Sequence, residues 1–262
     1  MAKLETKTNL KQTLDALVET YENPDFVKDD PIQFIHKFTD KKDIEIAGFI
    51  SSCFAFGKRE LFIKKLNDFF EIANNKPLEY VLNGDFSKLK DFNYRFIKPN
   101  DMMEMMRILR ELYAKDGGLE ELFKFAYKNA STNSIFNYST FFKTVTDYFY
   151  SRVKNPVGQG FYFMLPNPEK GGAMKRMNMY LRWMVRKSVV DFGIWTFMKP
   201  SELLIPLDVH VGRISRELGI LNRKANDFKS VIEITDCLRE FCPEDPIKYD
   251  FAMFGYGVNN KD

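Results

Sequence analysis

The spacing of apolar residues constrains the fold of this chain more than any other feature. Apolar residues return every three to four positions, which matches the 3.6-residue period of an α-helix. No alternating pattern is long enough to build a sheet, and no motif repeats at a fixed interval. The sequence therefore predicts an all-α fold. The segments with helical spacing are 10–21, 44–56, 61–73, 102–113, 141–150, 177–185, 209–218 and 231–241.

The composition is that of a globular protein, with 45% apolar and 29% charged residues. Three widely placed cysteines indicate a reducing compartment rather than a disulfide framework. No apolar stretch approaches the length of a membrane span, and the first residues do not resemble a signal peptide. We therefore expect a cytoplasmic protein with no membrane partner. The net charge of +3 does not by itself indicate a nucleic-acid partner.

The most informative segment for function is 205–215, where a proline-bounded apolar run leads to Asp208 at the start of a predicted helix. Val211, Ile214 and Leu218 define the core face of that helix. An acid at a helix N-terminus is stabilised in its ionised form. Asp208 is thus either a helix cap or a catalytic carboxylate, and the local pattern alone allows both.

Segment 207–215 reads Leu-Asp-Val-His-Val-Gly-Arg-Ile-Ser. It resembles the Val/Leu-Asp-x-His-Val-x-Arg-hydrophobic-Ser signature of the helix-hairpin-helix DNA glycosylase superfamily, which includes endonuclease III and 8-oxoguanine DNA glycosylase. The resemblance covers about residues 40–258 in patches. Further stretches that resemble these enzymes, in the same order along the chain, are 44–59, 94–96, 117–119 and 248–255. The stretches that resemble a related bacterial family of unknown function are 175–186 and 191–195.

The resemblance implies a single two-lobed helical unit with a degenerate helix hairpin. The hairpin is degenerate in that segment 165–175 is longer than the compact Leu-Pro-Gly-Val-Gly-x-Lys turn. The spacing from Lys175 to Asp208 is closer to that of archaeal 8-oxoguanine glycosylases than to that of endonuclease III. The expected lobes are about 1–98 with 223–262 and about 99–222, with the hairpin region at about 160–190.

The superfamily places its catalytic lysine after a glycine-rich turn, at the start of the second helix of the hairpin. In this chain Gly171 and Gly172 precede Lys175, which opens a helical pattern. Small residues in such a turn let backbone N–H groups approach a phosphate. An amine nucleophile must lose its proton, which the neighbouring Arg176 and the helix N-terminus favour. The resemblance therefore assigns catalysis to Lys175 and Asp208. The alternative is that Lys175 is a solvated surface lysine.

Positive charge is concentrated in residues 169–187, where six basic residues are balanced by a single acid. DNA binding needs such an excess because phosphate contacts supply most of the non-specific affinity. Arg182 and Arg186 share one helical stripe. These two arginines either pair with Asp191 or Asp208 inside the protein or line a cleft. The alternative for the whole segment 169–187 is a solvated surface with charges of both signs. The residues that we predict to contact DNA are Lys170, Gly171, Gly172, Arg176, Arg182, Lys187 and Arg213.

Phe254 resembles the aromatic residue that stacks on the flipped base in 8-oxoguanine glycosylases, although an aromatic at helical spacing is more often a core residue. His210 is two residues from Asp208 on a helix, so we interpret it as a packing residue rather than a base. Two histidines and dispersed cysteines do not indicate zinc, and no cysteine cluster follows Gly257 to hold an iron–sulfur cluster. We expect no metal or cofactor, except a monovalent cation that the resemblance allows at the hairpin turn.

The resemblance implies a base-excision DNA glycosylase with AP-lyase activity. It would act as a monomer at the nucleoid on damaged or abasic duplex DNA, with oxidised purines as one candidate target. Lys175 would attack the sugar C1′ and form a Schiff base, assisted by Asp208. This chemistry requires the two side chains to lie within reach of one hydrogen bond or one bridging water. The alternatives are a DNA-binding protein of the same fold without base excision, and a helical scaffold unrelated to DNA.

Overall fold

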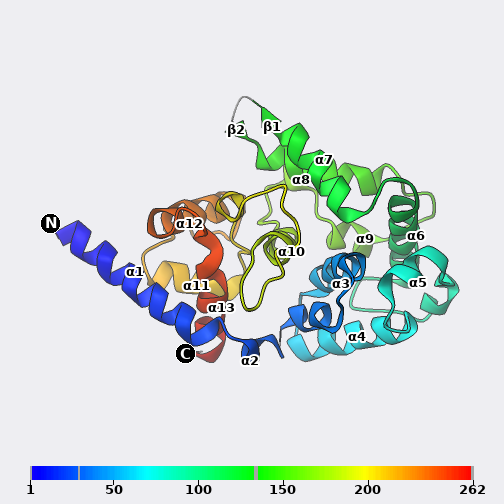
Figure 1. The fold of residues 1–262 in the computed structure, drawn as a ribbon, viewed down its shortest axis with the longest axis horizontal. Helices are drawn as coiled ribbons and strands as arrows, with labels where there is room; N and C mark the ends of the chain where they lie inside the picture. Colours follow the sequence, from blue (N-terminus) through cyan, green and yellow to red (C-terminus); the bar gives the residue numbers. More distant parts are fainter. Residues whose placement is uncertain (1, 29, 133–134, 261–262) are drawn as a thin grey trace. The chain divides into compact units, whose positions relative to one another are not determined.

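The computed structural model is all-α, as the sequence predicts, and describes residues 2–28, 30–132 and 135–260 (Figure 1). Each of the eight segments with helical spacing corresponds to an α-helix. Pro31 and Pro246 each begin a 3-10 helix. Across the described ranges, no helix is long and apolar enough to cross a membrane.

Unit 1, one of two compact units, combines the two ends of the chain, Met1–Asp30 and Gly171–Asp262. Its 3-10 helices are η4 (Pro200–Glu202) and η5 (Pro246–Lys248). Its α-helices are α1 (Ala2–Tyr21), α2 (Pro24–Val27), α10 (Lys175–Val185), α11 (Val209–Glu217), α12 (Phe228–Phe241) and α13 (Tyr249–Asn259).

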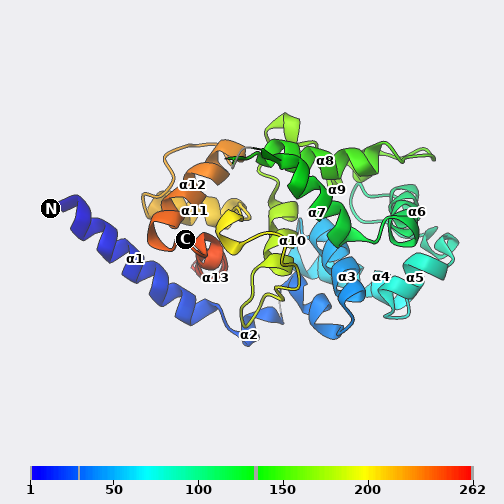
Figure 2. The ribbon, with the colours of Figure 1, turned by 45° about the horizontal axis from the view of Figure 1, so that its top comes forward.

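Helix α13 organises unit 1, because both α1 and α11 pack against it (red beside blue and yellow in Figures 1 and 2). Gly255 permits the close approach of α1, since a Cβ there would lie 2.6 Å from Cδ1 of Tyr21. Gly257 does the same for α11, since its Cβ would lie 3.1 Å from Cβ of His210. These contacts hold the start of α11, and with it Asp208, against α13.

Unit 2 is the continuous segment Pro31–Lys170. Its strands, β1 (Ser131–Thr132) and β2 (Ile135–Phe136), pair in antiparallel fashion over two residues each. Its 3-10 helices are η1 (Pro31–Lys37), η2 (Phe86–Leu89) and η3 (Pro168–Lys170). Its α-helices are α3 (Lys41–Phe54), α4 (Arg59–Ile72), α5 (Pro77–Asn83), α6 (Pro99–Lys115), α7 (Leu119–Ala130), α8 (Tyr138–Tyr150) and α9 (Gln159–Met164).

Helix α3 forms the core of unit 2 and is buried at every position from Ile44 to Phe54. Its Phe49 ring stacks on Phe149 of α8, with 5.4 Å between the ring centroids. The buried Glu45 carboxylate accepts a hydrogen bond of 2.9 Å from the Tyr113 hydroxyl of α6. Aromatic packing and this buried hydrogen bond therefore both join α3 to its neighbours.

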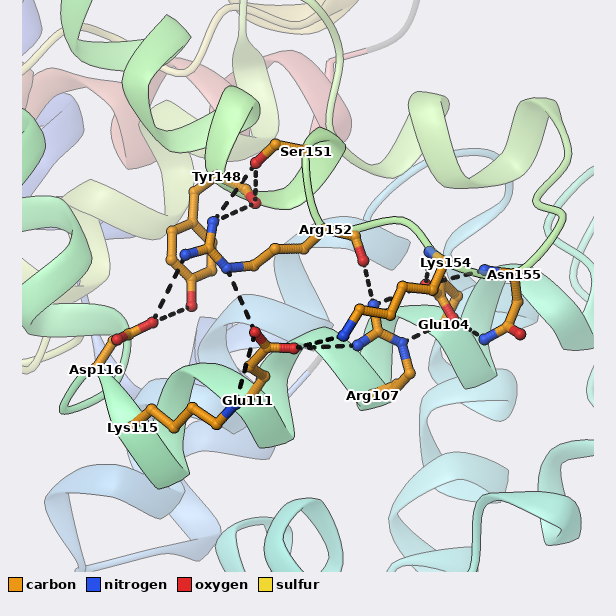
Figure 3. A network of polar contacts seen from close by, with 10 residues as sticks. All are labelled: Glu104, Arg107, Glu111, Lys115, Asp116, Tyr148, Ser151, Arg152, Lys154 and Asn155. Carbon is orange, nitrogen blue, oxygen red and sulfur yellow. Dashed lines mark hydrogen bonds and ion pairs between the residues drawn. The ribbon is translucent and has the colours of Figure 1, made fainter.

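A polar network ties α6 to the segment that follows α8 (Figure 3). The Glu104 carboxylate pairs with Arg107 at 2.8 Å and accepts hydrogen bonds of 2.6 Å from the Lys154 N–H and from the Asn155 side-chain amide. Burial alone would raise the pKa of Glu104, but these donors outweigh burial and lower the pKa to about 2. The Arg107 guanidinium also donates to the Arg152 carbonyl. This network fixes a segment without regular secondary structure.

The two units divide the chain at different positions from the expected lobes of about 1–98 with 223–262 and about 99–222. Residues 31–98 belong with 99–170 because α5 packs on both α3 and α6. Residues 171–222 belong with the chain ends because α11 packs on α13. The expected lobes are corrected accordingly.

Candidate active site in unit 1

Asp208 is the N-cap of α11, with an extended backbone at φ −117° and ψ −170°. Its Oδ1 accepts hydrogen bonds of 2.9 Å from the backbone N–H groups of His210 and Val211. This is the usual geometry of a capping aspartate, and it fixes the orientation of the carboxylate. The cap uses only Oδ1, so Oδ2 is available for a second role.

Lys175 is the first residue of α10 and lies opposite Oδ2 of Asp208. Its Nζ is 3.8 Å from that oxygen, and the two side chains are 31% and 13% exposed. The preceding residue, Met174, is in the left-handed region at φ 50°, and this sharp turn sets the direction in which α10 begins. The structure thus brings together the two residues to which the sequence assigned catalysis. Both are partly sheltered, and neither is fully buried.

The glycine turn before α10 is open to solvent. Gly171 is in the left-handed region at φ +70°, and a Cβ at Gly171 or Gly172 would meet nothing within 4 Å. Both residues are exposed. The carbonyl oxygens of Gly171 and Ala173 accept hydrogen bonds from the Phe228 N–H and the Asn178 side-chain amide. Each of these carbonyl oxygens accepts one hydrogen bond and keeps a second lone pair, so the monovalent cation that the resemblance allows stays a prediction.

The loop at residues 222–227 borders the site, and the sequence did not predict it. Arg216 of α11 holds this loop by donating to the carbonyls of Arg223 and Lys224 at 2.8 and 2.9 Å. The Asn226 amide donates to the Asp208 carbonyl at 3.3 Å. The loop is therefore anchored beside the start of α11. The sequence gives little indication of this loop, because an arginine that binds backbone carbonyl oxygens can do so at any residue type and has no characteristic sequence spacing.

The predicted DNA contact by Arg182 is wrong. Arg182 is 2% exposed and pairs with Asp191 at 3.1 Å and with Asp250 at 2.6 Å. Arg186 is buried as well and pairs with Asp191 at 2.8 Å. Of the alternatives for this stripe, the structure therefore shows pairing with Asp191 inside the protein, because α10 turns this face toward acids of the same unit.

Asp250 is a further acid near the site that the sequence did not single out. It lies in the first turn of α13 and is 6% exposed. Burial raises the pKa of Asp250 to about 6, and this exceeds the lowering by its partner Arg182. The charges of Asp208 and Lys175 also act on Asp250, in opposite directions. The sequence does not show that Asp250 is buried, because its burial depends on how α13 packs against the rest of the unit.

Arg213 of α11 and Phe254 of α13 both lie where these two helices pack together. Arg213 donates to the carbonyls of Gly257 and Asn260, each at 2.9 Å, so it caps the end of α13. Phe254 is half-buried and meets the His210 ring edge to face, with 5.8 Å between centroids. His210 itself contacts the Gly257 carbonyl through Nδ1 at 3.2 Å, as expected of a packing residue. Base stacking by Phe254 and DNA contact by Arg213 stay predictions.

The remaining predicted DNA contacts are distributed over both units. Lys170 is exposed at the end of η3 in unit 2, and Lys187 is exposed just after α10 in unit 1. Arg176, next to Lys175, is half-buried. The exposure of Lys170 and Lys187 is compatible with phosphate contacts, which stay predictions.

Comparisons with known proteins give one match. A family model described as a protein of unknown function (DUF2400) matches residues 30–259. No curated protein and no solved structure matches the chain. The matched range includes Lys175, Asp208 and Asp250.

Proposed function

The chain belongs to the DUF2400 family of proteins of unknown function, and we propose that it is a DNA glycosylase with AP-lyase activity. The observation that carries this proposal is the contact between Lys175 and Asp208, with 3.8 Å between Nζ and Oδ2. The two residues are 33 positions apart in the sequence and meet at the starts of two helices. An amine beside a fixed carboxylate is the minimum that Schiff-base chemistry at a sugar requires.

In the proposed reaction the target nucleotide is flipped out of the duplex, and the neutral Lys175 amine attacks its C1′. The glycosidic bond breaks, and the base leaves with a proton. The Asp208 carboxylate stabilises the positive charge that develops on the sugar, since its orientation is already fixed by the α11 cap. Opening of the sugar ring gives a Schiff base. Loss of a C2′ proton then expels the 3′-phosphate and nicks the strand.

The surroundings of the pair support a polyanionic substrate. The open turn at Gly171 and Gly172 lies directly before Lys175 and leaves room for a phosphate near backbone N–H groups. Lys187 is exposed in the same unit. We propose that these groups, together with Arg176, bind the DNA backbone near the flipped nucleotide. We propose the exposed Lys170 of unit 2 as a separate phosphate contact.

A panel of duplexes tests the proposal, each with a single lesion: an oxidised purine, an oxidised pyrimidine, uracil, an alkylated base or an abasic site. Strand cleavage with and without alkali separates base excision from lyase activity. We expect cleavage of the abasic duplex and of at least one damaged duplex, and no cleavage by Lys175→Gln.

Failure to cleave any duplex above the level of Lys175→Gln would contradict the proposal. Salt-dependent binding to the same duplexes then separates the two alternatives. Binding without cleavage indicates a non-catalytic DNA-binding protein, and absence of binding indicates a helical scaffold.

A further inference from the structure

The contact between Lys175 and Asp208 joins the starts of two helices that are far apart in the sequence. Lys175 follows the glycine turn, residues 171–174, and Asp208 directly precedes α11. The distance of 3.8 Å between Nζ and Oδ2 exceeds that of a direct hydrogen bond, and a partly exposed ion pair of this length contributes little to holding two helices together. Other contacts in unit 1 therefore determine how the two helix starts lie.

The loop at residues 222–227 is bound to the glycine turn through the backbone. The N–H of Phe228, directly after the loop, donates a hydrogen bond of 2.9 Å to the Gly171 carbonyl. Gly172 forms an isolated antiparallel bridge with Asp227, the last residue of the loop. A displacement of the loop would therefore also displace the turn from which α10 begins.

The same loop is bound to the start of α11. The Asn226 side-chain amide donates to the Asp208 carbonyl at 3.3 Å. Gly212 leaves room for this contact, because a Cβ there would lie only 2.7 Å from Oδ1 of Asn226. The loop therefore contacts both the turn that precedes Lys175 and the residue that carries the opposing carboxylate.

Arg216 fixes the conformation of this loop. Its Nε donates to the Arg223 carbonyl at 2.8 Å, and its Nη2 donates to the carbonyls of Lys224 and Ala225 at 2.9 and 3.2 Å. Nη2 also donates to Oδ1 of Asn226 at 2.6 Å. One planar guanidinium thus binds three consecutive carbonyl oxygens and the side chain that reaches the start of α11.

We infer that Arg216 is a positioning residue that acts through the 222–227 loop. By fixing the loop, it holds the start of α11 beside the glycine turn and keeps Asp208 opposite Lys175. Arg216 lies on α11 itself, so its loss removes four hydrogen bonds to the loop and leaves both members of the pair chemically unchanged. The consequence for catalysis rests on the proposed function, in which this pair reacts with DNA.

A carbodiimide tests the inference without DNA. The reagent activates a carboxylate, which forms an amide only with an amine in direct reach, so the crosslink yield reports the proximity of the two groups. Peptide mass mapping gives the Lys175–Asp208 yield in the full-length wild type and in Arg216→Met. The Lys248–Asp15 pair of the same unit, at 2.8 Å, is the internal reference. We expect Arg216→Met to lower the first yield at least about threefold relative to the second.

A second variant covers the case in which Arg216→Met does not fold. Asn226→Ala changes an exposed residue, removes the hydrogen bond to the Asp208 carbonyl and alters no charge. We expect it to lower the Lys175–Asp208 yield as well. The matched control is Arg239→Met on α12, because Arg239 also donates to a carbonyl oxygen, that of Ser201, outside the loop. This control should leave both crosslinks at their wild-type yields.

The two crosslinks separate positioning from general loosening of unit 1. A matching fall of the Lys248–Asp15 yield in Arg216→Met would indicate loosening and would overturn the inference. Wild-type Lys175–Asp208 yields in Arg216→Met and Asn226→Ala would overturn it too, as would absence of this crosslink in the wild type.

Borohydride trapping on an abasic duplex measures the consequence for the chemistry. We expect Arg216→Met to slow formation of the adduct by about tenfold and to leave the Kd for the duplex unchanged, because only the alignment of the pair is altered. A weaker Kd with an unchanged rate would contradict a positioning role. If the wild type forms no adduct, the proposed function fails, and the crosslink yields still decide the role of Arg216.

Discussion

The Asp208 carboxylate caps a helix, and we propose that it has a chemical role as well. Its Oδ1 caps α11 through two backbone N–H groups, while its Oδ2 faces Lys175. Capping accounts for the two hydrogen bonds at Oδ1 but does not require the contact between Oδ2 and Lys175. The two roles can be separated by choice of substitution, since an asparagine retains the acceptor oxygen of a cap and loses the charge.

Asp208→Asn should keep the melting temperature close to that of the wild type and slow cleavage of an abasic duplex by at least about 100-fold. The reason is that the amide still accepts from His210 and Val211 but no longer stabilises positive charge. Asp208→Ala should be equally slow and also less stable by about 1 kcal/mol. Thermal unfolding and single-turnover cleavage check both statements. Cleavage by Asp208→Asn at the wild-type rate would reduce Asp208 to a cap.

The resemblance in the sequence singled out Lys175 and Asp208, which the structure brings into contact, but it did not predict the environment of either residue. Lys175 and Arg182 lie on one stripe of α10, and their charge and spacing do not tell which is exposed. The difference arises because Asp191 and Asp250 approach only the second half of the stripe. Asp250 was missed for the same reason, since its depth is set by long-range packing of α13. A sequence pattern reports local periodicity and not which helix covers a given face.

Most of the longer helices were predictable, because they have an apolar face with helical spacing. Helix α7 was missed, although Leu119, Leu122, Phe123 and Ala126 have that spacing and are buried. Short helices such as α5 and α9 span too few residues for the pattern to be distinct. The division into two units was not predictable from composition, because it depends on α11 and α13 meeting across the sequence.

The polar network on α6 makes a prediction about acid stability. A carboxyl group whose pKa in the folded state is about 2, below its ordinary value of 4.5, adds stability above pH 4.5. That contribution is lost as the pH falls toward 2. Glu104→Gln should therefore be less stable than the wild type by roughly 2 kcal/mol at pH 7, with the difference about halved at pH 3. Urea unfolding of both proteins at the two pH values measures it. An equal difference at pH 7 and pH 3 would show that the Glu104 charge does not stabilise the fold.

The net charge of the whole chain is only +3, so the proposed DNA binding would depend on where the charges lie. Lys170 and Lys187 are both exposed, one in each unit. If both contact phosphates, Lys170→Glu with Lys187→Glu should weaken duplex binding and reduce the slope of log K against log salt by about 2. Fluorescence anisotropy over a range of salt concentrations measures this slope.

A matched control is Lys128→Glu with Lys199→Glu, which makes the same change of charge at exposed positions, again one in each unit. This control should lower the affinity less and leave the slope nearly unchanged. Equal effects of the two double variants would mean that binding responds to overall charge, and the predicted phosphate contacts would be wrong.

The proposed chemistry requires a covalent intermediate on Lys175, and borohydride can trap it. Borohydride reduces a Schiff base to a stable secondary amine, which leaves the protein attached to an abasic-site duplex. We predict a trapped adduct for the wild type and for the control Lys199→Gln at an exposed position of the same unit. We predict no adduct for Lys175→Gln, which should still fold and bind the duplex. Peptide mapping should place the adduct on Lys175. Absence of an adduct with the wild type, or trapping of Lys175→Gln at the wild-type level, would contradict the assignment.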